Sequence, residues 1–190
     1  EDMGILTGDA LLNYAYETAF KAFVTDPEES LRTGRALTVL GEKAGIYGMA
    51  GGQVIDVKET GHRISKDVLD TIYRLKTAAL IEASMMIGAI LGGASEEEVK
   101  KVEKIAEYIG VAFQIQDDIL DVTSSQEMLG KPVHSDEKNE KTTYVTLVGI
   151  EKAKEEVERL SGEALTLLHQ LSGENVFLEQ LLLWLIHRDR

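Results

Sequence analysis

The stretch from Gly110 to Asp121 has the pattern of an apolar helix, yet it carries three aspartates within five positions. On a helix, Asp117 and Asp121 are four residues apart and share a face, with Asp118 one step round. Gln114 precedes Asp118 by four residues, so its amide points the same way. Like charges at this spacing destabilise an isolated helix by about 0.2–0.5 kcal/mol per pair, and burial increases that cost. A bound cation would remove the conflict, and carboxylate oxygens are ligands that suit Mg²⁺.

The same aspartates could instead form a solvated face, since acidic helices are common. Aspartate is a poor helix former, however, and it is almost never buried without a partner. The apolar neighbours favour the buried version, and they are Val111, Phe113, Ile115, Ile119, Leu120 and Val122. The spacing therefore predicts a metal site formed by Asp117, Asp118 and Asp121.

The composition of the 190 residues favours helices and excludes several kinds of site. Aromatic residues make up only 6% of the chain, and there are only two prolines. The chain has no cysteine, so disulfides and thiolate ligands or nucleophiles are excluded, which fits a reducing compartment. A net charge of −13 argues against non-specific nucleic-acid binding. The apolar runs are broken by Glu82 or are too short to span a bilayer.

Helical patterns follow one another along the chain and no partner for a strand is apparent, so we predict an all-α fold. The expected helices cover residues 5–24, 28 or 29 to about 47, 65–91, 95–122, 142–147, 150–171 and 174–188. Residues 53–57, which follow the glycine-rich stretch 48–52, are also expected to be helical. Ser65 and Ser95 are the expected N-caps of two of them. The polar stretch 123–141 is expected to be a long loop of the kind that forms lids or is disordered. Because the chain opens directly into a core helix, we expect the sequence to be a fragment.

Three lysines could accompany the aspartates. Lys76 is followed by Thr77 in the middle of an expected helix, where its ammonium could extend to solvent or face a phosphate beside the metal. Lys131 and Lys141 bracket the polar loop, and loop lysines are usually inert surface groups. Their interest comes from following the aspartates so closely in the sequence.

Gln53 and Asp56 share one helical face after the glycines, where they could support the site or simply cap the helix. The histidines show no spacing typical of metal ligands, and they are His62, His134, His169 and His187. Serine nucleophile motifs, Walker loops and dinucleotide-binding glycine motifs are absent from the sequence.

Five motifs, in order, make the chain similar to the trans-isoprenyl diphosphate synthases, with the closest likeness to bacterial farnesyl diphosphate synthases. They are Gly8-Asp9-Ala10-Leu11-Leu12, Gly52-Gln53 with Asp56, Lys76-Thr77, the stretch from Gln114 to Asp121, and Gly130-Lys131. The aspartate-bearing stretch resembles the second aspartate-rich motif of that family. One such motif would be weak evidence, but five in sequence over essentially the whole chain are specific.

The resemblance implies a single all-α isoprenoid synthase domain over residues 1–190, which is a helical bundle around a central cavity without its N-terminal helices. It implies Mg²⁺ bound to the diphosphate of an allylic substrate, with Asp117 and Asp121 as ligands and Asp118 as a ligand or an orienting group. The family lysines that contact this diphosphate match Lys76, Lys131 and Lys141. A cytoplasmic homodimer that neither binds nucleic acid nor inserts stably into a membrane is expected from the same likeness.

The implied reaction condenses isopentenyl diphosphate with dimethylallyl or geranyl diphosphate to give farnesyl diphosphate or a similar short-chain product. Thr77 and Gln114 match groups whose oxygens face the developing carbocation, so both are candidate catalytic residues together with Lys76. The residue types fit this chemistry, because metal ions and lysines neutralise a departing diphosphate and dry apolar walls protect the cation from water. The reaction needs no protein nucleophile.

The family's first aspartate-rich motif, the arginine pair after it and the upstream basic groups have no counterpart in these 190 residues. The sequence therefore does not specify the product length, and we expect little or no turnover from residues 1–190 alone. Two alternatives stay open, a non-catalytic helical subunit of a heteromeric prenyl synthase and a terpene cyclase on the same fold. Cyclases usually replace the second motif with an Asn/Ser/Glu-type motif, and Asp117-Asp118-Ile119-Leu120-Asp121 does not match it. No function is assigned to His134.

Overall fold

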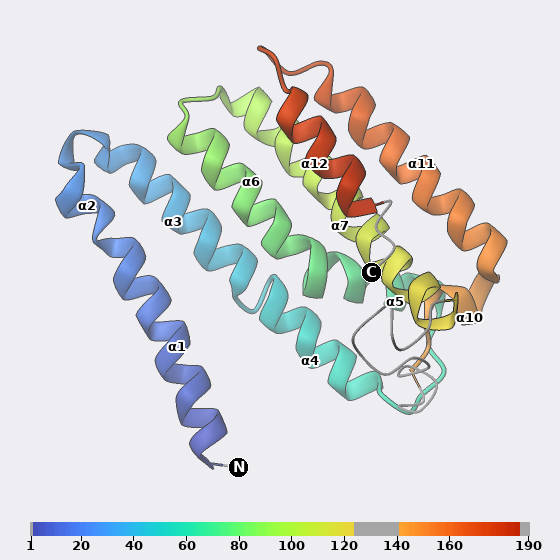
Figure 1. The fold of residues 1–190 in the computed structure, drawn as a ribbon. Helices are drawn as coiled ribbons and strands as arrows, with labels where there is room; N and C mark the ends of the chain where they lie inside the picture. Colours follow the sequence, from blue (N-terminus) through green and yellow to red (C-terminus); the bar gives the residue numbers. More distant parts are fainter. Residues whose placement is uncertain (1, 124–140, 187–190) are drawn as a thin grey trace.

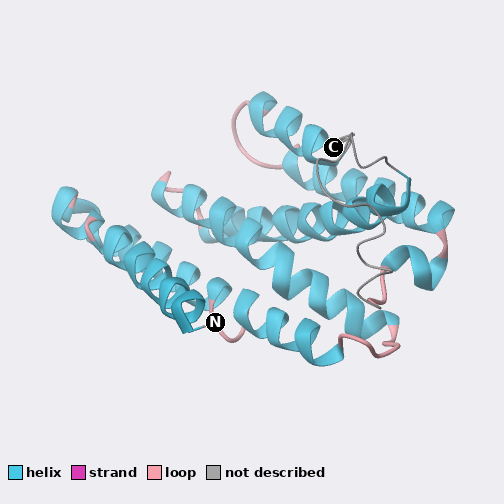
Figure 2. Ribbon diagram, turned by 60° about the horizontal axis from the view of Figure 1, so that its bottom comes forward, coloured by secondary structure: helices cyan, strands magenta, loops and turns pink. Residues whose placement is uncertain are grey.

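The computed structural model describes residues 2–123 and 141–186, and it is helical throughout these ranges apart from short connections (Figure 1). The elements are α1 (Asp2–Phe20), α2 (Ala22–Thr25), the 3₁₀ helix η1 (Pro27–Glu29), α3 (Ser30–Ala44), α4 (Met49–Glu59), α5 (Lys66–Ile72), the π-helix η2 (Tyr73–Ala78), α6 (Ala79–Leu91), α7 (Glu96–Thr123), α10 (Tyr144–Val148), α11 (Ile150–Leu168) and α12 (Val176–Ile186). Within these two ranges there is no strand, as Figure 2 also shows, so the all-α prediction is confirmed.

The long helix α7 lies at the centre of the bundle. It packs against α6 and η2 on one side and against α11 and α12 on the other. Its core stripe consists of Ile105, Ile109, Ala112 and Ile115, which are fully buried and follow the three- and four-residue spacing of one helical face. The same helix continues into the aspartates, and it also packs against α10 (Figure 1). The core therefore carries the aspartate stretch to one end of the bundle.

Hydrogen bonds at the two expected N-caps confirm where the helices begin. The Ser65 hydroxyl accepts the Val68 N–H at 3.4 Å. At the start of α7 the Ser95 hydroxyl accepts the Glu98 N–H at 3.3 Å, and the Glu98 carboxylate accepts the Ser95 N–H at 3.0 Å. This reciprocal pair is the capping box that satisfies backbone donors in the first turn.

The structure differs from the expected helices at two places. The helix expected over 65–91 contains the π-turn η2, a rare geometry often found at functional sites, and apolar periodicity does not distinguish it from α-helix. The helix expected over 5–24 is divided at Lys21 into α1 and α2, and α1 buries none of its residues, because within the described chain it packs mainly on α2. Its exposed apolar side chains include Ile5, Leu6, Leu11, Leu12 and Phe20.

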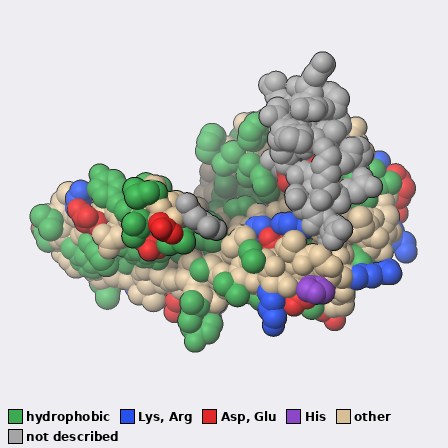
Figure 3. Space-filling view, turned by 90° about the horizontal axis from the view of Figure 1, so that it is seen from below, with side chains coloured by type: hydrophobic (Ala, Val, Ile, Leu, Met, Phe, Trp, Pro, Cys, Tyr) green, Lys and Arg blue, Asp and Glu red, His purple; other side chains and the backbone are tan. Residues whose placement is uncertain are grey.

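Basic and acidic side chains gather in the middle of the face shown in Figure 3, which views the molecule from below Figure 1. Apolar side chains gather mainly on the left part of that view. None of the helices in residues 2–123 and 141–186 combines the length and the apolar character needed to cross a bilayer.

A partly buried ionic cluster joins three helices. The Lys43 ammonium of α3 donates to the Glu82 carboxylate of α6, which is only 5% exposed, and to the Glu103 carboxylate of α7 at 2.6 Å. Burial lowers the pKa of Lys43, but the hydrogen bonds and charges of the two glutamates outweigh it, so this pKa lies above its ordinary value. The cluster therefore holds a charged lysine between the helices.

We predict that Lys43→Met lowers the free energy of unfolding by about 3 kcal/mol, because it removes the cation that contacts the buried Glu82 carboxylate. Urea denaturation of both proteins measures the difference. The matched control is Lys154→Met, which removes the exposed ion pair with Glu151 and should cost less than about 1 kcal/mol. Equal losses in the two variants would contradict a stabilising role for the ionic cluster.

Candidate active site

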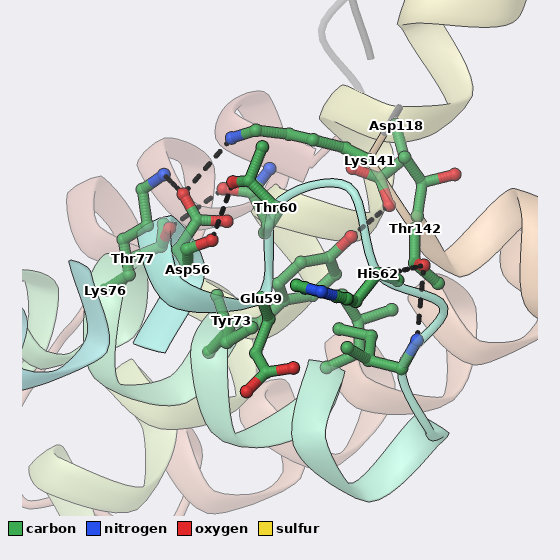
Figure 4. A pocket seen from close by; sticks show the side chains of 15 residues that line it. Asp56, Glu59, Thr60, His62, Tyr73, Lys76, Thr77, Asp118, Lys141 and Thr142 are labelled. Carbon is green, nitrogen blue, oxygen red and sulfur yellow. Dashed lines mark hydrogen bonds and ion pairs between the residues drawn. The ribbon is translucent and has the colours of Figure 1, made fainter. Parts of the chain in front are cut away.

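A cavity lies at the end of the core where α4, η2, α7 and the segment before α10 meet (Figure 4). Its polar lining includes Asp56, Lys76, Thr77, Gln114, Asp118 and Lys141. The buried side chains of Leu69 and Ile72 form part of its apolar wall. The structure therefore brings together six of the residues that the sequence predicted for the site.

Two of the predicted lysines meet on one carboxylate oxygen. The Oδ2 atom of Asp56 accepts hydrogen bonds from the Nζ atoms of Lys76 at 2.5 Å and Lys141 at 3.1 Å (Figure 4). Burial alone would raise the pKa of Asp56, but the hydrogen bonds and charges of both lysines outweigh it and hold this pKa below its ordinary value. Each ammonium group can also donate hydrogen bonds to a phosphate-bearing ligand, while the carboxylates of Glu59 and Asp118 line the same cavity.

Thr77 and Gln114 form a polar pair beside the lysines. The Thr77 hydroxyl of η2 donates to the Gln114 side-chain oxygen of α7 at 2.8 Å, and both residues line the cavity. The pair places two oxygen atoms, each a negative dipole end, next to the basic groups. The structure thus places the two residues together, while their catalytic roles stay predictions.

Close packing of two glycines fixes the π-turn that carries Lys76 and Thr77. A Cβ atom on Gly52 of α4 would lie 2.4 Å from the Lys76 backbone nitrogen. A Cβ atom on Gly110 of α7 would lie 2.5 Å from the Ala78 Cα atom. Only glycine allows backbones to approach this closely, so helices on two sides press directly on the π-turn.

The three aspartates of α7 occupy different surroundings. Asp118 is 3% exposed, and its Oδ2 atom accepts the hydroxyl of Tyr73 and, at 2.8 Å, the backbone N–H of Tyr144. Asp121 is also buried, whereas Asp117 is half-buried. Neither of these two lines the cavity around Asp56, although their spacing places them on the side of α7 that Gln114 shares.

The donor set of this helix fits Mg²⁺. In the part of the chain that the structure describes, no three acidic or histidine side chains come together to enclose a metal ion. Magnesium does not require such a cage, since it usually keeps several waters and takes one or two carboxylates plus substrate phosphates. Asp117 and Asp121 supply two carboxylates four residues apart on one helix. Metal binding by these residues stays a prediction.

The remaining predicted residues lie elsewhere. Lys131 and His134 are outside the described residues. Gln53 is exposed on α4 and is not among the cavity-lining residues, so its supporting role stays a prediction.

Several lining residues had no signal in the sequence. The Thr142 hydroxyl donates to the His62 carbonyl at 3.3 Å and accepts the Ile64 N–H at 3.5 Å, although these residues are 80 and 78 positions apart. Tyr73 reaches Asp118 across 45 positions. Neither the spacing nor the type of these residues predicts such long-range contacts.

The family model described as Polyprenyl synthetase matches residues 1–172. The chain belongs to the polyprenyl synthetase family. The resemblance to trans-isoprenyl diphosphate synthases is thereby confirmed. Among curated proteins, the chain is 44% identical over 165 residues to a chloroplastic geranylgeranyl pyrophosphate synthase of Capsicum annuum, and this match covers 86% of the chain and 44% of the relative. It is 41% identical over 167 residues to the chloroplastic heterodimeric geranylgeranyl pyrophosphate synthase large subunit 1 of Arabidopsis thaliana, covering 86% of the chain and 45% of the relative.

Solved structures agree with the family assignment. The polyprenyl synthetase superimposes on a Helicobacter pylori geranyltransferase crystallised with magnesium and isoprenyl diphosphate, with a TM-score of 0.81 and 32% identity. That match covers 98% of the chain and 60% of the Helicobacter pylori protein. The chain spans about half the length of the curated relatives it matches.

Proposed function

We propose that this polyprenyl synthetase transfers an allylic prenyl group to isopentenyl diphosphate, forming a short-chain prenyl diphosphate and inorganic pyrophosphate. The observation that carries the proposal is the convergence of the Lys76 and Lys141 ammonium groups on one oxygen of Asp56, beside the Thr77–Gln114 pair. In this reaction the allylic C–O bond breaks, the double bond of isopentenyl diphosphate attacks the allylic carbon, and a proton leaves the new product.

The cavity residues supply the groups that such a reaction needs. Lys76 and Lys141 neutralise the negative charge that develops on the departing diphosphate, with Lys131 proposed as a third cation. The oxygens of Thr77 and Gln114 face the positive charge on carbon, while Leu69 and Ile72 limit access of water. Mg²⁺, when bound, adds positive charge at the leaving diphosphate, and Asp117 and Asp121 would hold it.

Names of the relatives support a product of 15 or 20 carbons without separating the two. The plant relatives are named geranylgeranyl pyrophosphate synthases, whereas one solved relative is named a geranyltransferase. We therefore propose farnesyl or geranylgeranyl diphosphate as the product, with dimethylallyl or geranyl diphosphate as the first allylic substrate. A cytoplasmic location remains a proposal, since the plant relatives are named as chloroplastic.

Assembly with a second chain is part of the proposal. We infer a homodimer, but one relative is named the large subunit of a heterodimeric synthase, so a heteromeric complex is the second candidate. If the chain is a non-catalytic subunit of such a complex, it would modulate a partner enzyme. The grouping of both lysines with Gln114 around one cavity favours a catalytic chain.

The test is incorporation of radiolabelled isopentenyl diphosphate with dimethylallyl, geranyl or farnesyl diphosphate as acceptor, with Mg²⁺ or with a chelator. The chain is assayed as it stands and as the C-terminal half of a chimera that begins with the N-terminal segment of the Capsicum annuum synthase. We expect the chimera to extend an allylic acceptor only with Mg²⁺, and chromatography gives the product length. A folded chimera that incorporates no label would contradict the catalytic proposal, and a chain that only stimulates a partner synthase would favour the modulating subunit.

A further inference from the structure

The two lysines of the cavity belong to segments that are far apart in sequence. Lys76 lies in η2 and Lys141 lies in the segment before α10. Their ammonium groups meet on Asp56, but both side chains are long and flexible, so this contact alone does not fix their backbones. A diphosphate site needs both backbones to be held in place.

One buried oxygen atom contacts both of these segments, through a tyrosine side chain in one and a backbone N–H in the other. Oδ2 of Asp118 accepts the hydroxyl of Tyr73, the first residue of η2, and the backbone N–H of Tyr144, the first residue of α10. Lys76 follows Tyr73 by three residues, and Lys141 precedes Tyr144 by three residues. The oxygen therefore links α7 to both lysine-bearing segments. In each segment the residue that it contacts lies three residues from the lysine.

The surroundings make this link rigid. Asp118, Tyr73 and Tyr144 are all buried, with exposures of 3, 6 and 4%. Hydrogen bonds to an ionised carboxylate are stronger than neutral ones, and low local polarity strengthens them further. The hydroxyl of the adjoining Thr143 accepts the Thr146 N–H at 3.2 Å and caps α10. The start of this short helix is therefore also fixed.

We propose that Asp118 is a positioning residue, which acts by holding the segments of Lys76 and Lys141 in place for a diphosphate and does not bind the metal. This assignment rests on the proposed function, since it refers to the same diphosphate site. The proposal gives the aspartates of α7 two different roles. Asp117 and Asp121 hold the metal, and Asp118 orients the lysines through Tyr73 and the Tyr144 N–H.

Amide hydrogen exchange of the 190-residue chain tests the link whether or not the chain turns over substrate. Asp118→Ala should raise exchange about 10- to 100-fold in two separate segments, 73–78 and 144–148, because each loses a charge-assisted hydrogen bond. Asp117→Ala is the matched control, since it removes the same charge one residue away, and it should leave both segments protected. Unchanged exchange in both segments of Asp118→Ala would overturn the proposal.

Tyr73→Phe keeps the proposal testable if Asp118→Ala fails to fold, because it removes only one hydroxyl. It should raise exchange in 73–78 and leave the Tyr144 N–H protected. It should also weaken binding of inorganic pyrophosphate with Mg²⁺ by about 3- to 10-fold, as expected for one lost hydrogen bond. Tyr108→Phe, a hydroxyl removed elsewhere on α7, is the control. Full protection and full affinity in Tyr73→Phe would overturn the proposal.

Metal binding separates positioning from ligation. With pyrophosphate present, Mn²⁺ bound per chain is counted by electron paramagnetic resonance for Asp117→Asn and Asp118→Asn. We expect Asp118→Asn to keep its Mn²⁺, because its amide oxygen can still accept both hydrogen bonds, and Asp117→Asn to lose it. Loss of Mn²⁺ in both variants would make Asp118 a ligand and overturn the proposal. If the unchanged chain binds neither Mn²⁺ nor pyrophosphate, the proposed function fails, while hydrogen exchange still decides whether Asp118 holds the two segments.

Discussion

Asp117→Asn should lower the turnover of the Capsicum chimera by about 100- to 1,000-fold, which is the loss expected when one preorganised charge-stabilising group is removed. The change keeps the size of the side chain and removes its charge. A neutral amide is a poorer ligand for Mg²⁺ than a carboxylate, so less charge is neutralised on the departing diphosphate. Steady-state incorporation of labelled isopentenyl diphosphate, at an Mg²⁺ concentration that saturates the parent chimera, measures the loss.

The control for this variant is Glu97→Gln, which removes the same charge from the exposed first turn of the same helix. It should retain the turnover of the parent chimera. Raising the Mg²⁺ concentration should partly restore Asp117→Asn if the carboxylate contributes to metal affinity. Undiminished turnover in Asp117→Asn would contradict the assignment of Asp117 as a ligand.

Gly52→Ala should lower both stability and diphosphate affinity, because its methyl group would lie 2.4 Å from the backbone nitrogen of Lys76. The nearest neighbour is backbone, which cannot rotate away, so the π-turn or α4 must move. Overpacking of this kind costs about 1–3 kcal/mol of unfolding free energy. Thermal denaturation and pyrophosphate titration measure the two effects.

Gly162→Ala is the matched control, since Gly162 lies inside α11 and an added methyl group would meet no neighbouring element of the described chain within 4 Å. Alanine there should raise stability by about 0.5–1 kcal/mol, because glycine is unfavourable in a helix interior. The two variants therefore change stability in opposite directions, since only the methyl group at position 52 meets backbone atoms. A Gly52→Ala protein as stable as the parent, with unchanged pyrophosphate affinity, would contradict the close approach of α4 to the π-turn.

The sequence predicted the helices well because their signals are local. Apolar spacing along α7 and the caps at Ser65 and Ser95 depend on residues within one or two turns of each other. The same local pattern does not report which helices a given face meets. The exposure of α1 therefore differs from the core helix that its apolar spacing predicted.

The candidate site was predicted in part. The structure groups Asp56, Lys76, Thr77, Gln114 and Lys141, all of which were selected from spacing or from the family resemblance. The sequence did not predict the π-turn, since such turns are rare and occur as single turns inside α-helices. It also left the role of Asp118 open between ligand and orienting group, because the hydroxyl and the N–H that it accepts lie 45 and 26 positions away.

The central claim is that the cavity between Lys76 and Lys141 binds a diphosphate. Isothermal titration of the chain with inorganic pyrophosphate in excess Mg²⁺ tests it most directly, with the Lys76→Met/Lys141→Met double variant as the comparison. Methionine keeps the apolar stem of each side chain and removes its charge. We predict a single pyrophosphate per chain, with affinity falling about 100-fold or more in the double variant, since each charged contact contributes roughly a factor of ten. Equal affinity in the two proteins would contradict the account.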